Sequence, residues 1–297
     1  MNILLTGAGG FLGKALLRKA GPDLKITTLD RVALPGRHIL CDITDETALR
    51  KALSGRAFHA VIHLAGLPSG SPEELFLVNV RGTANLAKTV QTRRFVIASS
   101  CAVYGEPRTP DGAVSEGHPT GPVSHYGRSM LEREHAVPDG VALRLFNIIG
   151  PGQRPGMLVP DLAGKLARIA LGLQDGPLVT GPLTTERDYL DVSDAAGAFL
   201  AAASASNSPG VLNVGSGMCH TGMDVLNALA EAMGVHPEIV FEDRPSGVFR
   251  IRADIRAAAA CLGFKPGVSF SESLGAVADD WLNRSADPKA SSGFFGR

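Results

Sequence analysis

The residues best suited to bind a ligand form a glycine-rich turn near the start of the sequence. The run TGAGGFLG follows a short apolar segment and opens a helical pattern, which is the context that a phosphate-binding turn requires. Gly7 would permit the tight turn, Gly10 would let a pyrophosphate approach the backbone, and Gly13 would let the helix pack on the strand. The backbone N–H groups of Phe11 and Leu12 would then face an anion at the positive end of the helix. The run therefore predicts a dinucleotide site, although glycines alone would also fit an ordinary tight turn.

A carboxylate at the end of the second apolar segment favours the dinucleotide site over the ordinary turn. Asp30 lies 17 residues after Gly13, where it can accept hydrogen bonds from both ribose hydroxyls and would repel a 2′-phosphate. The cofactor is therefore expected to be NAD rather than NADP. The adjacent Arg31 could pair with a phosphate, which weakens that preference.

Short apolar runs alternate with helical patterns through the first half of the chain. Runs with the composition of buried strands lie at residues 3–5, 26–29, 60–64, 95–98 and 141–145. Residues 13–20 and 75–92 repeat apolar side chains at helical spacing. This alternation indicates parallel βαβ units, and so an α/β fold with a doubly wound Rossmann sheet that carries helices on both faces.

The second half of the sequence has a different character. Residues 150–156 read GPGQRPG, which breaks regular structure, and the segment beyond mixes helices with isolated short strands. We expect an NAD-binding Rossmann domain over residues 1–150 and about 188–217, and a smaller C-terminal α/β substrate-binding region over about 151–187 and 218–297.

The composition argues against several classes of function. The 297 residues carry 29 basic and 29 acidic side chains, so neither a nucleic-acid surface nor a polybasic membrane surface is expected. No apolar run reaches the roughly 18 residues of a membrane helix, and the N-terminus lacks the basic start of a signal peptide. The four cysteines are widely spaced and the eight histidines form no metal-ligand pattern. We therefore expect no metal, no disulfide framework and a cytoplasmic location.

Further motifs follow the glycine turn in order along nearly the whole chain. They are CDITD at residues 41–45, HLAG at 63–66, NxxGT at 79–83, SSCAVYG at 99–105, PVSHYGRS at 122–129, RLFNIIGPG at 144–152, RDYLDVSD at 187–194 and RPSG at 244–247. In this order they resemble the extended short-chain dehydrogenases/reductases, of the NAD-dependent nucleotide-sugar epimerase/dehydratase family (UDP-glucose 4-epimerase-like).

The resemblance implies roles for particular residues. Ser100 would be the catalytic hydroxyl, and Tyr126 would transfer the proton. Asn147 would face a nucleotide-diphosphate sugar, while Arg187 and Arg244 would bind its diphosphate, which matches the geometry of guanidinium groups. The segments that would contact NAD contribute Asp42, Ile43, Leu64, Ala65, Gly66, Asn79 and Tyr126.

The YxxxK motif of this family is broken here. Met130 stands four residues after Tyr126, at the place of the lysine. A free phenol has a pKa of about 10, and a nearby ammonium is the usual means of lowering it. Methionine copies the length of lysine but not its charge, and Arg128 would point to the other side of the helix. The catalytic site is therefore expected to be atypical.

Several functions are compatible with these residues. The leading hypothesis is an NAD-dependent epimerase of nucleotide-diphosphate sugars that works like a 4-epimerase, through transient hydride transfer. The first alternative is an NDP-4-keto-sugar reductase, because a neutral tyrosine can donate a proton without the lysine. A dehydrogenase for a small alcohol or acid and a catalytically silent NAD-binding protein are further alternatives. The resemblance also implies a homodimer in which the helices of Asn79 and Tyr126 form a four-helix bundle.

Overall fold

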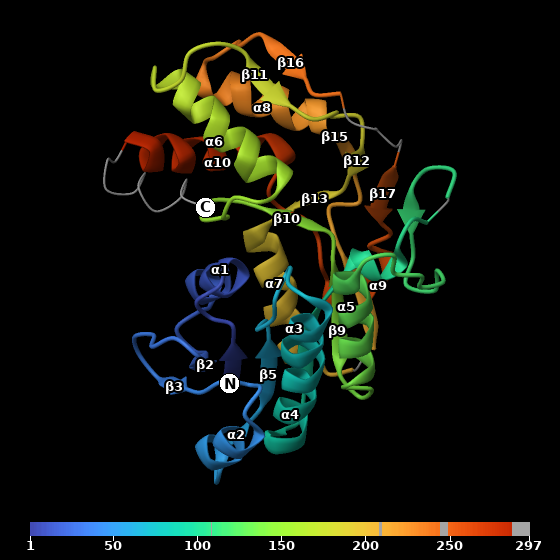
Figure 1. Ribbon diagram of the computed structural model, residues 1–297. Helices are drawn as coiled ribbons and strands as arrows, with labels where there is room; N and C mark the ends of the chain where they lie inside the picture. Colours follow the sequence, from blue (N-terminus) through green and yellow to red (C-terminus); the bar gives the residue numbers. More distant parts are fainter. Residues whose placement is uncertain (108, 208–209, 244–248, 287–297) are drawn as a thin grey trace.

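A seven-stranded parallel sheet forms the centre of the protein in a computed structural model, which describes residues 1–107, 109–207, 210–243 and 249–286 (Figure 1). Its strands follow the spatial order β14 (Val211–Val214), β9 (Val141–Leu145), β7 (Phe95–Ser100), β5 (Ala60–His63), β1 (Asn2–Thr6), β2 (Lys25–Asp30) and β3 (His38–Leu40). All neighbouring strands in this sheet run parallel. The order reverses between β1 and β5, which places a ligand crevice at their carboxyl ends.

Helices cover both faces of this sheet. On one face lie α1 (Phe11–Lys19), α7 (Val192–Ser204) and α9 (Arg256–Leu262). On the other lie α2 (Glu46–Leu53), α4 (Gly82–Thr89) and α5 (His125–His135). The predicted doubly wound α/β fold is therefore confirmed, and each of the five predicted strands is present.

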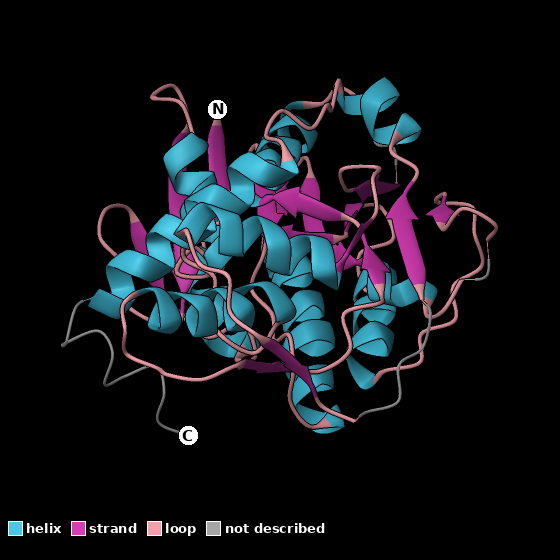
Figure 2. Cartoon of the chain, turned by 90° about the horizontal axis from the view of Figure 1, so that it is seen from above, coloured by secondary structure: helices cyan, strands magenta, loops and turns pink. Residues whose placement is uncertain are grey.

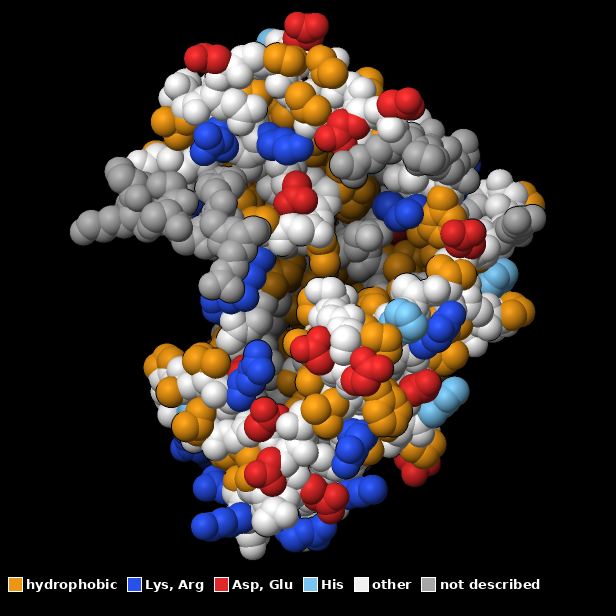
Figure 3. All heavy atoms as spheres, viewed as in Figure 1, with side chains coloured by type: hydrophobic (Ala, Val, Ile, Leu, Met, Phe, Trp, Pro, Cys, Tyr) orange, Lys and Arg blue, Asp and Glu red, His pale blue; other side chains and the backbone are white. Residues whose placement is uncertain are grey.

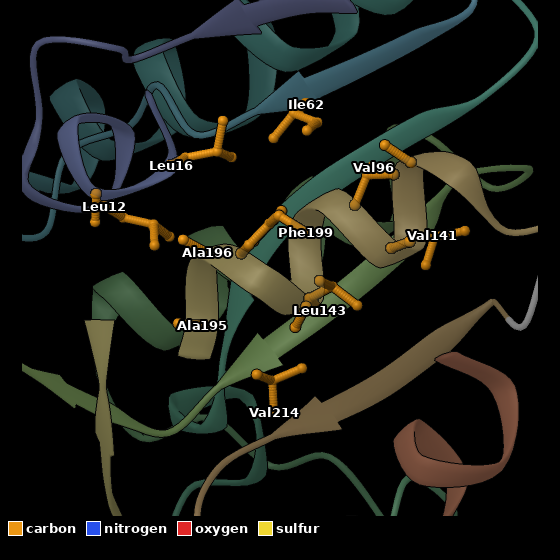
Figure 4. Close-up of a cluster of buried hydrophobic side chains, with 14 of the residues drawn as sticks. Leu12, Leu16, Ile62, Val96, Val141, Leu143, Ala195, Ala196, Phe199 and Val214 are labelled. Carbon is orange, nitrogen blue, oxygen red and sulfur yellow. The ribbon is translucent and has the colours of Figure 1, made fainter. Parts of the chain in front are cut away.

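The apolar side of α7 fixes the first layer of helices to the sheet. Figure 4 shows Phe199 of α7 close to Leu12 and Leu16 of α1 and to Ile62 and Val96 of the sheet. Phe199 is fully buried, and burial of such a side chain contributes about 1.5–3 kcal/mol. The turn between β1 and α1 is thus held on a rigid base.

A second apolar cluster lies above the carboxyl ends of the strands. It is formed by α6 (Leu158–Ala170), α8 (Gly222–Met233) and α10 (Phe270–Ala286), together with the strand pair β11 (Leu178–Thr180) and β16 (Ile239–Phe241). In Figure 1 these elements form the upper part of the molecule. Figure 2 shows the whole chain from above, with its strands lying among the helices. The boundaries of the two expected domains stay a prediction.

Short strands connect the two parts. β10 (Asn147–Ile149) pairs with β13 (Tyr189–Asp191), and a four-stranded sheet has the order β15 (His220–Thr221), β12 (Glu186–Arg187), β17 (Arg250–Ala253) and β8 (Ala113–Val114). A last pair joins β4 (Ala57–Phe58) and β6 (Gln91–Thr92). No helix within the described ranges is long and apolar enough to cross a membrane.

The helix expected over residues 75–92 has a different course. It is divided into α3 (Pro72–Leu75), a π-helical segment η1 (Phe76–Arg81) and α4, and it ends at Thr89 before β6. A π turn adds one residue to the helical repeat, and the spacing of apolar side chains cannot reveal that insertion. The π segment carries Asn79, whose side chain is fully buried.

Candidate active site

The glycine turn has the tight geometry that its sequence predicts. Gly7 has a φ of +70°, and the N–H of Gly10 donates to the Gly7 carbonyl at 3.0 Å. A Cβ on Gly7 would lie 2.6 Å from the Ala65 nitrogen, and one on Gly13 would lie 2.3 Å from the Gly7 oxygen. Side chains at these two places are therefore excluded by backbone, so the strand ends and the helix meet closely.

The start of α1 can receive an anion. The helix begins at Phe11 with Gly10 as its N-cap, no side chain caps it, and its first turn holds no acidic residue. The backbone N–H groups of Phe11 and Leu12 stand at the positive end of the helix. A Cβ on Gly10 would contact only the Gly7 oxygen, so the space outside this turn is open. These features fit the pyrophosphate of a dinucleotide.

Asp30 lies beside this turn at the end of β2. Its Oδ2 accepts a hydrogen bond from the Gly9 N–H at 3.3 Å, and its side chain is only partly buried. The adjacent Arg31 is exposed. The carboxylate is thus placed where a ribose would follow the pyrophosphate.

The CDITD segment borders the same side of the sheet. Asp42 is exposed, and its Oδ1 accepts from the N–H and the hydroxyl of Thr44, both at 2.8 Å. Ile43 is buried against Gly82, where a Cβ would lie 2.8 Å from the isoleucine side chain. Ile43 therefore packs against the start of α4, and Asp42 shapes the loop at the surface.

A buried histidine orders the end of β5. His63 Nδ1 lies 2.6 Å from the Thr6 hydroxyl, and its Nε2 lies 2.8 Å from the Thr83 hydroxyl. Thr83 donates its proton to the Asn79 carbonyl at 2.6 Å, so it accepts from Nε2–H of a neutral imidazole. Burial, and then the charge of Arg133, hold the pKa of His63 well below its usual range. His63 is therefore a neutral structural residue.

Leu64, Ala65 and Gly66 follow His63 at the carboxyl end of β5. The Ala65 N–H donates to the Thr6 hydroxyl at 3.2 Å, which fixes this segment beside the glycine turn. Leu64 and Ala65 are partly exposed, and Gly66 is exposed. The predicted cofactor residues from β1 and β5 therefore lie at one edge of the sheet.

Asn79 joins this edge to α5. Its Oδ1 accepts from the Leu67 N–H at 2.8 Å, and its Nδ2 donates to the Leu67 carbonyl and to the Ser129 hydroxyl, each at 3.0 Å. Both protons of Nδ2 are used within the protein. Asn79 thus positions the loop and the helix of Tyr126.

Ser100 and Tyr126 come together at the end of β7. The Ser100 hydroxyl accepts from the Ala102 N–H at 3.2 Å at the start of the 3₁₀ helix η2 (Cys101–Tyr104). Tyr126 lies in the first turn of α5, which Ser124 caps. Burial raises the pKa of Tyr126, while hydrogen bonding by Ser100 and the charge of Arg133 lower it. The structure thus brings together the two residues expected to act on a substrate oxygen.

The lysine position is apolar. Met130 is buried and packs in a cluster with Val103, Tyr104, Val114, Phe146, Ile251 and Ala253. Arg128 is exposed, as its helical position predicts. Burial raises the pKa of the Cys101 thiol to about 12, so this neighbour of Ser100 is a neutral thiol.

One charged residue near Tyr126 was not recognised from the sequence. Arg133 lies seven residues after Tyr126 on α5 and is 2% exposed, and its Nη2 donates to the His63 carbonyl at 2.9 Å. The signal that could have found it is the spacing, since positions seven residues apart share one face of a helix.

The predicted substrate residues lie on β10 and β12. Asn147 Nδ2 donates to the Asp188 carbonyl at 3.0 Å. The Arg187 guanidinium stands 4.1 Å from the centre of the Phe249 ring, and its Nη1 donates to the Phe249 carbonyl at 3.3 Å. Arg244 lies outside the described residues. The surface is hollowed between the upper helices and the central sheet (Figure 3).

A pocket opens over β12 and β17, on the side of Glu186. Its volume is about 350 Å³, and it is lined by Asp111, Glu186, Gly217, Met218, Cys219, Arg250 and Arg252. Both arginines of this lining already face acids, since Arg250 pairs with Glu186 at 2.6 Å and Arg252 pairs with Asp111. In the ranges that the structure describes, no group of three His, Cys, Asp or Glu residues could hold a metal ion.

A doubly wound sheet, a glycine turn at its switch point and a Ser–Tyr pair define a dinucleotide-dependent enzyme class. The model of the NAD-dependent epimerase/dehydratase family matches residues 3–215. The chain belongs to this family, and it is therefore an NAD-dependent enzyme.

Relatives at similar distance have different activities. The chain is 30% identical to a GDP-6-deoxy-D-mannose reductase of Pseudomonas aeruginosa, over 95% of this chain and 98% of the relative. It is also 30% identical to a UDP-glucose 4-epimerase of Yersinia pestis, over 97% and 99%.

Solved structures share the fold. RMD from Pseudomonas aeruginosa complexed with NADPH aligns with a TM-score of 0.86 at 28% identity, over 95% of this chain and 99% of that one. MoeE5 in complex with UDP-glucose and NAD aligns with a TM-score of 0.81 at 32% identity, over 97% and 100%. Both neighbours are complexes with a nicotinamide dinucleotide.

Proposed function

We propose that this enzyme acts on a nucleotide-diphosphate sugar as an NAD-dependent 4-epimerase with an atypical catalytic site. The observation that carries the proposal is the meeting of Ser100 and Tyr126 at the carboxyl end of β7, close to the edge where the predicted cofactor residues lie. An NDP-4-keto-sugar reductase is the second candidate. The neutral methionine at position 130 favours it, because reduction begins from a protonated tyrosine.

The chemistry divides between the cofactor and the chain. A bound NAD would supply the acceptor for a hydride from the sugar carbon and the donor that returns it. Ionised Tyr126 would take the proton of the reacting hydroxyl on its phenolate oxygen, which leaves a ketone on the sugar. Ser100 would donate a hydrogen bond to that same sugar oxygen. In the reverse direction, neutral Tyr126 returns its proton to the carbonyl oxygen as the hydride arrives.

The substrate would extend from this pair toward β10 and β12. We assign Asn147 to the sugar nucleotide and Arg187 and Arg244 to its diphosphate, while Asp30 favours NAD through the ribose. The support for Arg187 is its place on β12, where its partly buried guanidinium lies over the Phe249 ring. Guanidinium groups match phosphate oxygens in geometry and charge.

The remaining parts of the proposal concern assembly and location. We assign a homodimer in which the helices of Asn79 and Tyr126 form a four-helix bundle. Phe76 and Leu77, on the same helical region as Asn79, are large apolar side chains exposed by 47% and 40%. All four cysteines are free thiols, which suits the cytoplasm.

Thermal unfolding with combined ligands tests the substrate class. The protein is heated with NAD, NADH or NADP, alone and with UDP, dTDP, GDP or CDP. A ligand at about 100 times its dissociation constant adds roughly 2.7 kcal/mol to the free energy of unfolding. We expect a shift from NAD that grows with one nucleotide diphosphate. A shift from NAD alone would contradict the nucleotide-sugar assignment and favour a small-molecule dehydrogenase.

The consumption of cofactor separates the two candidate activities. An epimerase regenerates its NAD, whereas a reductase consumes external NADH in proportion to product. Tyr126→Phe removes the proton-transfer group and should abolish either activity while the NAD-induced shift in melting temperature remains. Unchanged activity in this variant would favour a different catalytic group.

A further inference from the structure

The missing lysine leaves Tyr126 without a charged neighbour four residues along its helix. The next position on the same face is three residues further, at Arg133. Seven residues of α-helix turn by about 700°, which is 20° short of two full turns, and rise by about 10.5 Å. Helical side chains lean toward the N-terminus of their helix, so the long side chain of Arg133 reaches back toward Tyr126.

The guanidinium of Arg133 stands at the carboxyl end of β5. Nη2 donates to the His63 carbonyl at 2.9 Å, and Nη1 would lie 2.8 Å from a Cβ on Gly66. Gly66 is itself exposed, whereas Arg133 is 2% exposed. The charged group therefore lies just beneath the surface at the edge of the sheet where the predicted cofactor residues of β1 and β5 lie. It occupies space that the absence of a side chain on Gly66 leaves open.

Among the described residues, this buried cation has no carboxylate partner, and its Nε has no hydrogen-bond partner. The nearby Arg144, in contrast, is paired with the buried Glu134. An unpaired buried charge is costly, and burial lowers the pKa of Arg133 to about 10. Ionised Tyr126 raises the pKa of Arg133, and the charge of Arg133 lowers the pKa of Tyr126.

We propose that Arg133 takes the place of the absent lysine as the positioning residue that stabilises ionised Tyr126, with Gly66 and the apolar Met130 as the adaptations that accompany it. The proposal rests on the function proposed above. The effect on Tyr126 itself can be measured without a substrate, so the two proposals can fail separately.

The ionisation of Tyr126 can be followed directly, because the chain has only three tyrosines. The ultraviolet absorbance of tyrosinate is recorded after rapid pH jumps that finish before unfolding, and the difference from Tyr126→Phe isolates the signal of Tyr126. Within the described ranges, the groups that influence the ionisation of this phenol are the Ser100 hydroxyl, the Cys101 thiol and the Arg133 guanidinium.

Three variants separate charge from packing in this titration. Arg133→Gln keeps a donor for the His63 carbonyl but removes the charge, and we expect Tyr126 to ionise at higher pH. Arg133→Lys keeps a cation at neutral pH, but a buried ammonium loses its proton more readily than a guanidinium, so the midpoint should lie between those of the wild type and Arg133→Gln. Arg128→Met removes an exposed cation from the same helix and should change nothing. An unshifted Tyr126 midpoint in folded Arg133→Gln would overturn the proposal.

Relocation of the charge provides a second test through activity. Arg133→Gln should slow oxidation of the sugar hydroxyl by at least about 100-fold, the lower end of a general acid–base contribution, and should move the midpoint of the ascending limb of its pH profile to higher pH. Met130→Lys combined with Arg133→Gln returns a cation to the same helical face and should recover most of the rate. Met130→Leu with Arg133→Gln should not recover it. Equal recovery by both double variants would show a packing effect and contradict the proposal.

Discussion

Glu134 and Arg144 form a buried two-point ion pair between α5 and β9. The Glu134 carboxylate accepts from Arg144 Nε at 2.9 Å and from Nη2 at 2.7 Å, and it also accepts from the Ser99 hydroxyl. Both charged side chains are 6% exposed. The pair therefore fixes the helix of Tyr126 to the two strands whose ends carry Ser100 and precede Asn147.

Loss of this carboxylate should destabilise the protein strongly. Glu134→Gln leaves the Arg144 guanidinium buried without its counter-charge, which costs about 3–5 kcal/mol for pairs of this kind. Urea denaturation measures the change in free energy of unfolding. Glu46→Gln is the control, because its pair with Arg50 is exposed on a helix surface and contributes no more than about 0.5 kcal/mol. Equal effects of the two substitutions would contradict the role of the buried pair.

The glycine turn should not tolerate a methyl group at its third glycine. Gly13→Ala places a Cβ 2.3 Å from the Gly7 oxygen, and relief of such overpacking costs about 1–3 kcal/mol. We expect a lower melting temperature and a smaller stabilisation by NAD. Gly21→Ala is the matched control, since no atom lies within 4 Å of its Cβ position. A normal NAD shift in Gly13→Ala would show that the turn is not the pyrophosphate site.

Asp30 should set the preference for NAD over NADP. Asp30→Asn keeps the size of the side chain and removes the charge that would repel a 2′-phosphate. The ratio of the dissociation constants for NADP and NAD, measured by calorimetry, should fall in this variant. Asp23→Asn, at an exposed position before β2, controls for net charge. An unchanged ratio would mean that a residue other than Asp30 selects the cofactor.

The fold can be predicted from the local sequence pattern, whereas the chemistry of the site can be predicted only in part. Short apolar runs between helical segments are enough to specify parallel strands, and the glycine spacing specifies the turn after β1. The π turn around Asn79 is not predictable, because one inserted residue leaves the apolar spacing of a helix almost unchanged.

Arg133 shows what local pattern omits. An arginine within a helix is usually exposed, and its sequence neighbours give no sign of burial. Its partner is the carbonyl of His63, 70 residues earlier in the chain. Arg187 likewise packs on Phe249, 62 residues away. Helical spacing can place Arg133 on the face of Tyr126, but these two contacts and the burial of Arg133 depend on the completed fold, so residue types and spacing alone do not reveal them.

Acid should weaken the fold through His63. The folded-state pKa lies well below the usual 6.5, so the unfolded chain binds this proton first. The contribution of His63 is therefore complete above about pH 6.5 and is lost as pH falls toward the folded pKa, by up to about 1.4 kcal/mol per pH unit. Urea denaturation from about pH 7.5 to pH 5 measures this slope. His125→Gln, at an exposed histidine, should keep the slope, whereas His63→Gln should reduce it.

The two directions of hydride transfer should respond oppositely to pH. Oxidation of a hydroxyl needs ionised Tyr126, and burial raises the pKa of this phenol, so the oxidation rate should climb by about tenfold per pH unit until Tyr126 is mostly ionised. Reduction of a ketone needs the neutral phenol and should be flat at neutral pH, then decline over the same alkaline range. Initial rates with NAD and NADH, recorded on one preparation across that range, give both profiles. If the rise in the oxidation rate and the fall in the reduction rate share one midpoint and both vanish in Tyr126→Phe, Tyr126 carries the proton. If both pH dependences persist in that variant, another group carries it.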